Sequence, residues 1–414
     1  MAPEPGKAAA SPGMTGLGMD DRELLSARMV AALMDLEKAK AALANYSPQA
    51  MAMASTWDSL NNRLARHLAA ISSLLQALPG PQGIATSWAR FAELQDELGS
   101  TTREILALVQ GGPLRDSEQG GGIYALADAL IREVAADLGR PWAGITLPGE
   151  REQLTTRSSI IHLTFPQVSV WDLPIVLHEY GHEVAPEIRN ELGLSPFQLM
   201  CSAAGSAVER SHLTELFADA FASCACGPAF VCTLVVLRFD PTAKEATQDL
   251  PTHPSHARRV ALALRVLEEK SIEDVSWAGL VEELAEAWRS SLEVSRSGSA
   301  VDEPAAAPAS ASARDPVSKL LAILALMPRA SYRSWGRAQR LAPLLAGSSV
   351  LETPEEGVTI RDALNAAWLA RLRLPAEWFD IGRRAQHLIR SIATGRLRGA
   401  SDSGAGRGGG ALDR

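Results

Sequence analysis

The sequence predicts a mainly α-helical protein with a small β-sheet near the middle of the chain. Three observations lead to this prediction. Apolar residues recur at helical spacing through most of the 414 residues. A short β-branched stretch at residues 158–165 (SSIIHLTF) is typical of a strand. Segments rich in Pro, Gly, Ala and Ser divide the helical patterns into N-terminal, central and C-terminal groups.

The composition is that of a globular protein with a sizeable core, at 46% hydrophobic and 21% charged residues. It excludes a wholly disordered chain and a disulfide-rich miniprotein. The net charge of −8 argues against a basic nucleic-acid binder, and the 5% aromatic content argues against a stacking surface for single strands. Nucleic acid is therefore not an expected partner.

The cysteines contain no C-x-x-C pair, which excludes a cysteine-type zinc ribbon. We expect them to be reduced and buried, as in a reducing compartment. The first residues (MAPEPGKAAASPGMTGLG) have no apolar segment of the kind found in signal peptides. Together these features predict a cytoplasmic location.

The N-terminal part is predicted to be a helical bundle at residues 19–145, preceded by a disordered tail at residues 1–18. We expect Pro79-Gly80-Pro81 and Gly111-Gly112-Pro113 to end helices, because Gly and Pro interrupt them. The four helical patterns of the bundle cover residues 22–45, 55–78, 85–110 and 123–138.

The central part, residues 146–294, is predicted to combine the strand with helices. Its helical patterns cover residues 176–185, 211–227, 255–270 and 274–295. Residues 220–237 carry no charge and are long enough for a membrane span. Gly227-Pro228 interrupts them, so we expect a buried helix, a break and a second buried segment, with no membrane span.

The C-terminal part begins with a predicted linker at residues 295–316. A helical region at residues 317–395 and a disordered tail at residues 396–414 follow. The helical patterns cover residues 316–327, 331–345, 355–373 and 376–393, with Thr353-Pro354-Glu355-Glu356 as a helix start. Residues 371–414 contain nine Arg and four acidic residues, which we interpret as a solvated helix face and a basic tail.

The strongest functional signal lies on the predicted helix at residues 176–185, where residues 178–182 read H-E-Y-G-H. Because positions i and i+4 lie on one face of a helix, His178 and His182 can bind one metal ion. Glu179 can act as the general base toward a water at that ion. Imidazole and carboxylate ligands suit zinc, although the same set can accept other divalent metals. The sequence therefore predicts one zinc ion per chain.

A third ligand is expected from the next helix, where residues 215–219 read E-L-F-A-D. We expect Glu215 to bind the metal. Asp219 lies one turn further on the same face and can hydrogen-bond a metal-binding histidine, while Ala218 leaves room for close helix packing. His212 shares the face of Glu215, and we interpret it as a neighbour rather than a ligand.

A third motif, T-H-P-S at residues 252–255, precedes Arg259. The order H-E-x-x-H, E-x-x-A-D and [ST]-H-P resembles the gluzincin peptidases that include the CAAX prenyl protease and the bacterial heat-shock membrane protease HtpX. The resemblance covers residues 155–270 and implies a zincin-like metallopeptidase core flanked by N- and C-terminal helical regions. The membrane helices of the best-known members are not expected in this chain.

The resemblance also assigns roles to individual residues. It implies Glu179 as catalytic base, Asp219 as the acid behind a ligand, and the zinc ligands His178, His182 and Glu215. His253 corresponds to a histidine near the active site that can hydrogen-bond the developing oxyanion. The alternative is that His253 packs at a helix start beside Pro254.

Three further residues have weaker assignments. Arg259 corresponds to a structural or active-site arginine of the family. His256 has no counterpart there and is expected at the surface. In gluzincins the edge strand beside the metal pairs with the substrate backbone, and the resemblance implies this role for residues 158–165. His162 on that strand is interpreted as a core or surface residue rather than a ligand.

These inferences predict a zinc-dependent endopeptidase that acts on a specific cytoplasmic protein or peptide. A narrower hypothesis is a regulatory protease that cuts one partner, similar to the repressor-cleaving H-E-x-x-H proteins. A third is a catalytically silent, zinc-stabilised interaction scaffold. The sequence indicates no particular oligomeric state.

Overall fold

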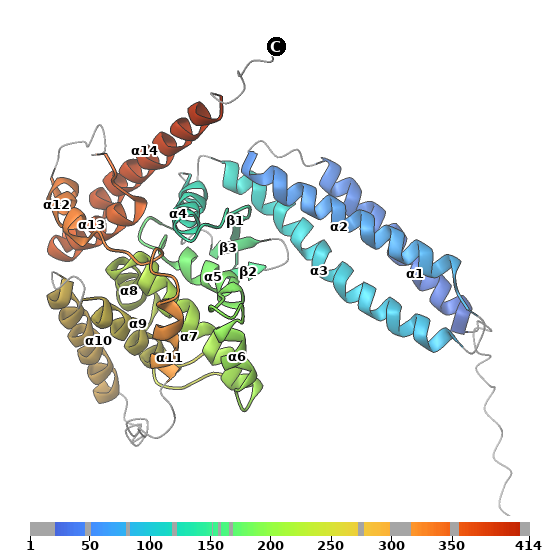
Figure 1. Ribbon diagram of the computed structural model, residues 1–414, viewed down its shortest axis with the longest axis horizontal. Coiled ribbons are helices and arrows are strands. Elements are labelled where there is room, and N and C mark those ends of the chain that lie inside the picture. Colours follow the sequence, from blue (N-terminus) through green and yellow to red (C-terminus); the bar gives the residue numbers. More distant parts are fainter. Residues whose placement is uncertain are drawn as a thin grey trace, which may run out of the picture. The chain divides into compact units, whose positions relative to one another are not determined.

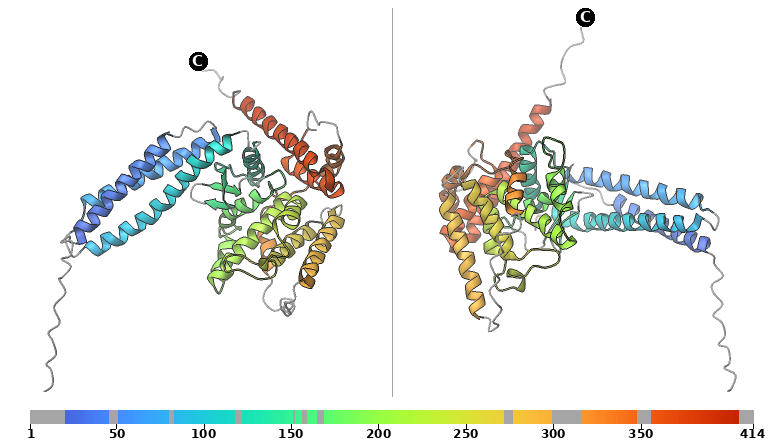
Figure 2. Two further views of the ribbon diagram at one scale, coloured as in Figure 1. Left: turned by 180° about the vertical axis from the view of Figure 1, so that it is seen from behind. Right: turned by 60° about the horizontal axis from the view of Figure 1, so that its bottom comes forward.

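The computed structural model describes residues 21–45, 51–79, 83–117, 122–150, 152–155, 159–164, 169–271, 277–298, 316–347 and 356–405 (Figures 1 and 2). These residues form a mainly helical protein with one three-stranded sheet, as predicted. The chain divides into two compact units between Gln110 and Gly111. The predicted tail at residues 1–18 and most of the predicted linker lie outside the described residues.

The first unit contains α1 (Asp21–Asn45), α2 (Met51–Gln76) and most of α3 (Ile84–Asp116). The apolar face of α1 packs on α2. Its buried residues recur at helical spacing: Leu25, Met29, Leu36 and Leu43. Arg63 of α2 forms a buried ion pair with Glu104 of α3 and donates to Thr101 Oγ1 at 2.8 Å. Among the described residues of this unit there is no cluster of potential metal ligands.

The sheet belongs to the second unit and has the strand order β1-β3-β2. Its strands are β1 (Ile145–Gly149), β2 (Gln153–Thr155) and β3 (Ile160–Thr164). β3 pairs in parallel with β1 and antiparallel with β2. The strand predicted at residues 158–165 is therefore present as β3. It lies at the centre of the sheet, so its expected edge position is wrong. The edge beside it is β2, whose three residues are too few to show a strand pattern.

The helices of the second unit share one continuous hydrophobic core, which extends from Ile123 to Ile392. The helix α5 packs on β2, β3 and α7, which places it at the centre of this unit (Figure 1). In chain order the helices are α4 (Ile123–Asp137), α5 (Ile175–Val184), α6 (Pro196–Ser202), α7 (Ala207–Cys226), α8 (Pro228–Thr233), α9 (His256–Ser271), α10 (Ala278–Gly298), α11 (Pro316–Leu324), α12 (Trp335–Ala346), α13 (Ile360–Arg373) and α14 (Trp378–Ala405).

This core corrects the predicted domain boundaries. α4, predicted as part of the bundle at residues 19–145, packs on β1, α5, α13 and α14. The helices of the predicted C-terminal region, residues 317–395, share their core with residues 146–294. Periodicity shows which face of a helix is apolar but not which partner covers that face, so the boundaries could not be placed from the sequence.

The helix α3 does not end at Gly111-Gly112-Pro113 as predicted but continues to Asp116. Arg115 in its last turn donates to the carbonyl oxygen of Thr146 at 2.6 Å and to Asp128 at 2.7 Å. All three residues are buried. These hydrogen bonds outweigh the weak helix propensity of Gly and Pro.

Two helices of the C-terminal part have different ends from those predicted. α13 begins at Ile360 rather than near residue 355, because Thr359 and Asp362 form a capping box. α14 continues to Ala405, past the predicted start of the tail at residue 396. Residues 406–414 lie outside the described part of the chain.

The uncharged stretch at residues 220–237 contains the predicted break. α7 ends at Cys226, Gly227 has a φ of 74°, and α8 begins at Pro228. A left-handed φ of this kind suits glycine, which therefore ends the helix. The four cysteines form no disulfide bond, and all but Cys201 are buried. Among the described residues, no helix has the length and hydropathy to span a membrane.

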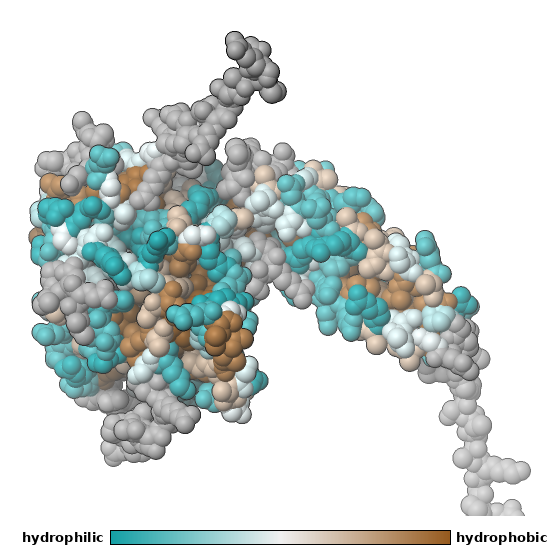
Figure 3. Space-filling model, viewed as in Figure 1, coloured by the Kyte–Doolittle hydropathy of each residue, from teal (hydrophilic) through white to brown (hydrophobic). Residues whose placement is uncertain are grey.

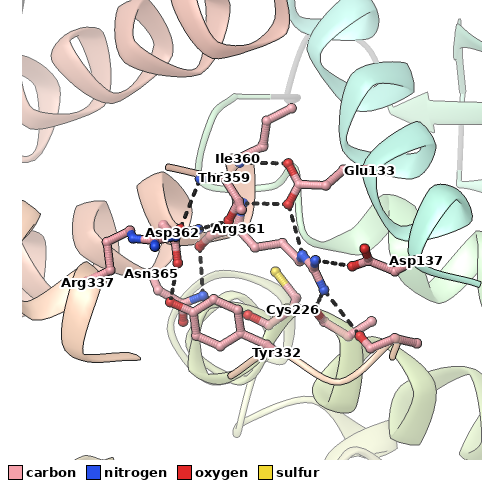
Figure 4. A network of polar contacts seen from close by, with 12 residues as sticks. Glu133, Asp137, Cys226, Tyr332, Arg337, Thr359, Ile360, Arg361, Asp362 and Asn365 are labelled. Atoms are coloured by element: carbon pink, nitrogen blue, oxygen red, sulfur yellow. Dashed lines mark hydrogen bonds and ion pairs between the residues drawn. The ribbon is translucent and has the colours of Figure 1, made fainter. Parts of the chain in front are cut away.

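A buried polar network joins α13 to α4 and to the turn between α7 and α8 (Figure 4). The Arg361 guanidinium donates to Glu133 at 2.9 Å. The Asn365 side chain donates to the carbonyl oxygen of Cys226 at 2.7 Å and accepts from the Ala229 amide at 2.9 Å. The C-terminal helices therefore hold the end of α7.

Candidate metal centre

Two neighbouring helices, α5 and α7, carry the residues predicted to bind a metal. They can approach closely because Gly181 of α5 has no side chain: a Cβ there would lie 3.0 Å from the Cα of Ala218. Ala218 is fully buried at this contact, as expected from its small size. The close packing brings the predicted ligands of the two helices to one place.

Three potential ligand atoms meet between these helices. The Nε2 atoms of His178 and His182 lie 3.2 Å apart. Glu215 places Oε2 at 3.4 Å from His178 Nε2 and Oε1 at 3.7 Å from His182 Nε2. Each of the three residues can offer one ligand atom, and these atoms lie within 4.8 Å of one another, so the three side chains could hold one metal ion. Within the described residues, this is the cluster that could hold a metal.

Asp219 supports the centre from behind. Its Oδ1 lies 2.9 Å from Nδ1 of His178, so it accepts the Nδ1 proton and holds Nε2 toward the site. Arg259 of α9 donates to both Asp219 oxygens, at 2.7 and 2.8 Å. Because Asp219 is fully buried, this bidentate pair is what keeps the carboxylate charged.

The charges of the centre shift several pKa values. Burial alone would lower the pKa of His178, but Asp219 and Glu215 raise it to about 10. Burial and the nearby His178 charge lower the pKa of His182 to about 4. Burial would raise the pKa of Glu215, but His178 and Arg259 lower it to about 2. In the metal-free state the centre therefore carries one excess proton, on His178.

Glu179 lies on α5 beside these ligands and is buried against them. Burial raises the pKa of Glu179 to about 7, although the charge of His178 acts in the opposite direction. A carboxyl group poised near neutral pH can accept and release a proton during a reaction.

His253 approaches the same centre from the segment before α9. Its Nε2 lies 3.7 Å from Glu215 Oε2, and its side chain is 50% exposed. The Thr252 hydroxyl lies 2.8 Å from His253 Nδ1 and orients the ring. His253 therefore borders the centre on its open side rather than packing beneath Pro254.

A cavity of about 510 Å³ opens over the centre. Its walls come from the edge strand β2, from α5 and α7, from the turn that follows α8, and from the start of α9. The residues that line it, besides the predicted site residues, are Glu152, Gln153, Leu154, Ile175, Leu234, Arg238, Phe239, His256 and Arg259.

Sequence reasoning missed the ion pairs on one side of this cavity. Arg238 donates to Glu152 at 2.9 Å and lies 3.0 Å from Asp172 Oδ1, so Asp172 is an ion-pair partner as well as a residue of the turn before α5. One signal was present: Arg238 is the first charged residue after the uncharged stretch at residues 220–237. No sequence pattern indicated Glu152, because the neighbouring strand β2 is too short to be predicted.

The remaining central histidines lie outside the ligand cluster. His212 Nε2 lies 2.7 Å from the carbonyl oxygen of Leu250, and His212 is not part of the ligand cluster. Burial lowers the pKa of His162 on β3. His256, predicted at the surface, is half-buried and stacks on Phe239 with ring centroids 4.2 Å apart. His256 is therefore part of the cavity wall, and its predicted surface position is wrong.

Comparison of the chain with protein-family models, curated proteins and solved structures finds no match.

Proposed function

We propose that the chain is a zinc-dependent endopeptidase of the gluzincin type. The observation that carries this proposal is the spacing of the His178, His182 and Glu215 ligand atoms, which fits one tetrahedral ion, with the buried acid Glu179 beside them. The three motifs in gluzincin order support it. Under this proposal the cavity between β2 and α9 is the substrate cleft of a zincin-like core.

Zinc, when bound, lowers the pKa of water and polarises the substrate carbonyl. Glu179 takes a proton from the attacking water and passes it to the leaving amine. Its pKa of about 7 suits both steps, since the group is ionised often enough to accept a proton and basic enough to hold it.

Three other residues position the groups that react. Asp219 fixes the tautomer and orientation of His178, and Arg259 fixes Asp219. His253 stands at the open side of the centre, where it can donate a hydrogen bond to the oxygen that becomes negative during attack.

The expected substrate is an extended peptide segment of a specific cytoplasmic protein. The edge strand β2 supplies its cavity wall through Gln153 and Leu154. A free strand edge can pair with a peptide backbone through main-chain hydrogen bonds. β2 takes the role that the resemblance implied for residues 158–165, because β3 is already paired on both sides.

The first experiment measures zinc in the purified full chain and in Glu215→Ala after mild washing with a chelator. We expect about one zinc per wild-type chain and strongly reduced zinc in the variant. Asp249→Ala is the matched control, because this acid lies outside the ligand cluster. A folded wild-type protein that takes up no zinc would remove the proposal.

The second step screens peptides with the zinc-loaded protein and with Glu179→Gln. The variant should keep zinc and lose cleavage, because it keeps the three ligands but lacks the base. Cleavage that persists in Glu179→Gln would show that another residue, or a contaminant, performs the reaction.

A further inference from the structure

An exposed turn joins α13 to α14 and includes the short helical turn η7 (Pro375–Glu377). Residues 372–380, which we call the aromatic turn, are all exposed. Trp378 is 49% and Phe379 67% exposed, and Leu372 and Leu374 are exposed beside them. All other aromatic side chains among the described residues are buried or half-buried. Large apolar side chains that remain uncovered together mark an interaction surface.

The base of the turn is fixed to the core while its tip stays in solvent. The Arg371 guanidinium lies over the rings of Trp171 and Trp368, at 4.7 and 4.8 Å from their centroids. Trp378 and Phe379 contact each other edge to face, with centroids 5.9 Å apart. The two exposed rings are therefore presented by an anchored support.

Positive charge accompanies this apolar tip. Within residues 371–395 there are five Arg and two acidic residues. Both acids are paired, Asp380 with Arg383 at 3.1 Å and Glu377 with Arg384 at 3.9 Å. Residues 381–401 contain no acidic residue, and Arg383 and Arg390 lie on the exposed face of α14.

We propose that the aromatic turn docks the protein on an anionic membrane surface. Trp and Phe side chains insert at the headgroup level of a bilayer, and arginines beside them attract anionic lipids. A continuous exposed tip with a basic helix next to it suits this occupant, since the lipid surface supplies both the apolar layer and the opposite charge. The proposal does not depend on the proposed function, because none of these residues lines the cavity over the metal centre.

A second exposed apolar group differs from the aromatic turn in its side-chain type and in its charge. Leu192, Leu194 and Leu199 lie on the segment before α6 and on α6, where Figure 3 shows hydrophobic surface. This group contains no aromatic residue, and Arg189 and Glu191 beside it balance in charge. It therefore serves as the matched control.

The test is flotation of the full chain with vesicles of phosphatidylcholine, alone or with added phosphatidylserine. We expect binding about tenfold or more tighter to the anionic vesicles, and weaker binding as salt is added. Trp378→Ser/Phe379→Ser should reduce binding about tenfold or more, because the inserted apolar area is lost. Leu192→Ser/Leu199→Ser should bind like the wild type.

Several outcomes would overturn the proposal. They are no vesicle binding, equal binding by the aromatic double variant, or a wild-type dimer that this variant abolishes, which would make a second copy the occupant. Circular dichroism of the double variant checks that it is folded. Glu215→Ala should bind vesicles normally, so failure of the membrane proposal and failure of the zinc proposal are distinguishable.

Discussion

Asp219 links the metal-ligand candidate His178 to the buried Arg259. It holds His178 through Nδ1 and receives two hydrogen bonds from Arg259, and it is fully buried. Burial would raise the pKa of Asp219, but Arg259 and His178 hold it well below its usual range. A permanently charged acceptor behind the ligand makes the imidazole a stronger donor to a metal.

Asp219→Asn should therefore weaken zinc binding by about 10- to 100-fold. The amide keeps the size of the side chain but removes the charge that orients His178. Competition with a chelating dye measures the affinity. Asp249→Asn is the control, since Asp249 pairs with Arg258 at a more exposed position and should leave the affinity unchanged. Equal affinities of Asp219→Asn and wild type would contradict this role.

Zinc affinity should rise with pH. The pKa of His178 is raised to about 10, so the metal-free centre holds a proton at neutral pH that zinc must displace. His182 and Glu215, with pKa values of about 4 and about 2, are already deprotonated. The association constant should increase about tenfold per pH unit between about pH 7.5 and 9, with one proton released per zinc.

Calorimetry in buffers of different ionisation enthalpy counts the released protons. Glu179→Gln is the control: it removes the group with a pKa of about 7 and should keep the release from His178. A pH-independent affinity over this range would contradict protonation of His178.

At the scale of elements, the contact between α5 and α7 builds the site. With only 10 residues, α5 is positioned by its neighbours rather than by its own stability. Gly181 and Ala218 set the distance between the two helices, and the ligands lie on the same faces. The approach of these two helices thus determines whether three ligand atoms meet.

Gly181→Ala should lower the free energy of unfolding of the metal-free protein by about 1–3 kcal/mol. The new Cβ would lie 3.0 Å from the Ala218 backbone and 3.2 Å from Phe221, so the helices must separate. Zinc affinity should fall as well. Chemical denaturation with chelator present measures the stability.

Gly395→Ala is the matched control for this substitution. Gly395 lies in α14 with nothing within 4 Å of a Cβ, so alanine should be neutral or stabilising by up to about 1 kcal/mol. If the two variants had the same stability, the close contact would have no energetic role.

At the scale of the molecule, the second unit is held together by contacts between segments far apart in the sequence. Arg361 connects α13 to Glu133 in α4 and to the carbonyl oxygens of Ala225 and Ala330 (Figure 4). It also pairs with Asp137. A buried cation with this many partners fixes the arrangement of three separate segments.

Arg361→Met should lower the free energy of unfolding by about 3–5 kcal/mol, because Glu133 is left buried without its partner. Arg383→Met, which removes an exposed pair with Asp380, should change it by less than about 1 kcal/mol. Thermal or chemical unfolding of both variants makes the comparison. A small effect at Arg361 would mean that the packed apolar surface alone holds α13.

Some features of the fold and of the candidate site could be predicted from the sequence because they depend on local geometry. The i, i+4 spacing of His178 and His182 places them on one helical face wherever the helix lies. The mainly helical class follows from apolar periodicity in the same way. The break at Gly227 follows from the conformations that glycine allows.

Other features depend on contacts between distant segments, and only the tertiary structure decided them. The division at Gln110, the edge position of β2 and the inclusion of His256 and Arg238 in the cavity wall are of this kind. The sequence by itself determined which residues can share a helical face. The tertiary structure decides which faces meet, and therefore which side chains surround the candidate metal. This depends on how apolar surfaces are buried and how buried charges are paired throughout the unit, and no local pattern contains that information.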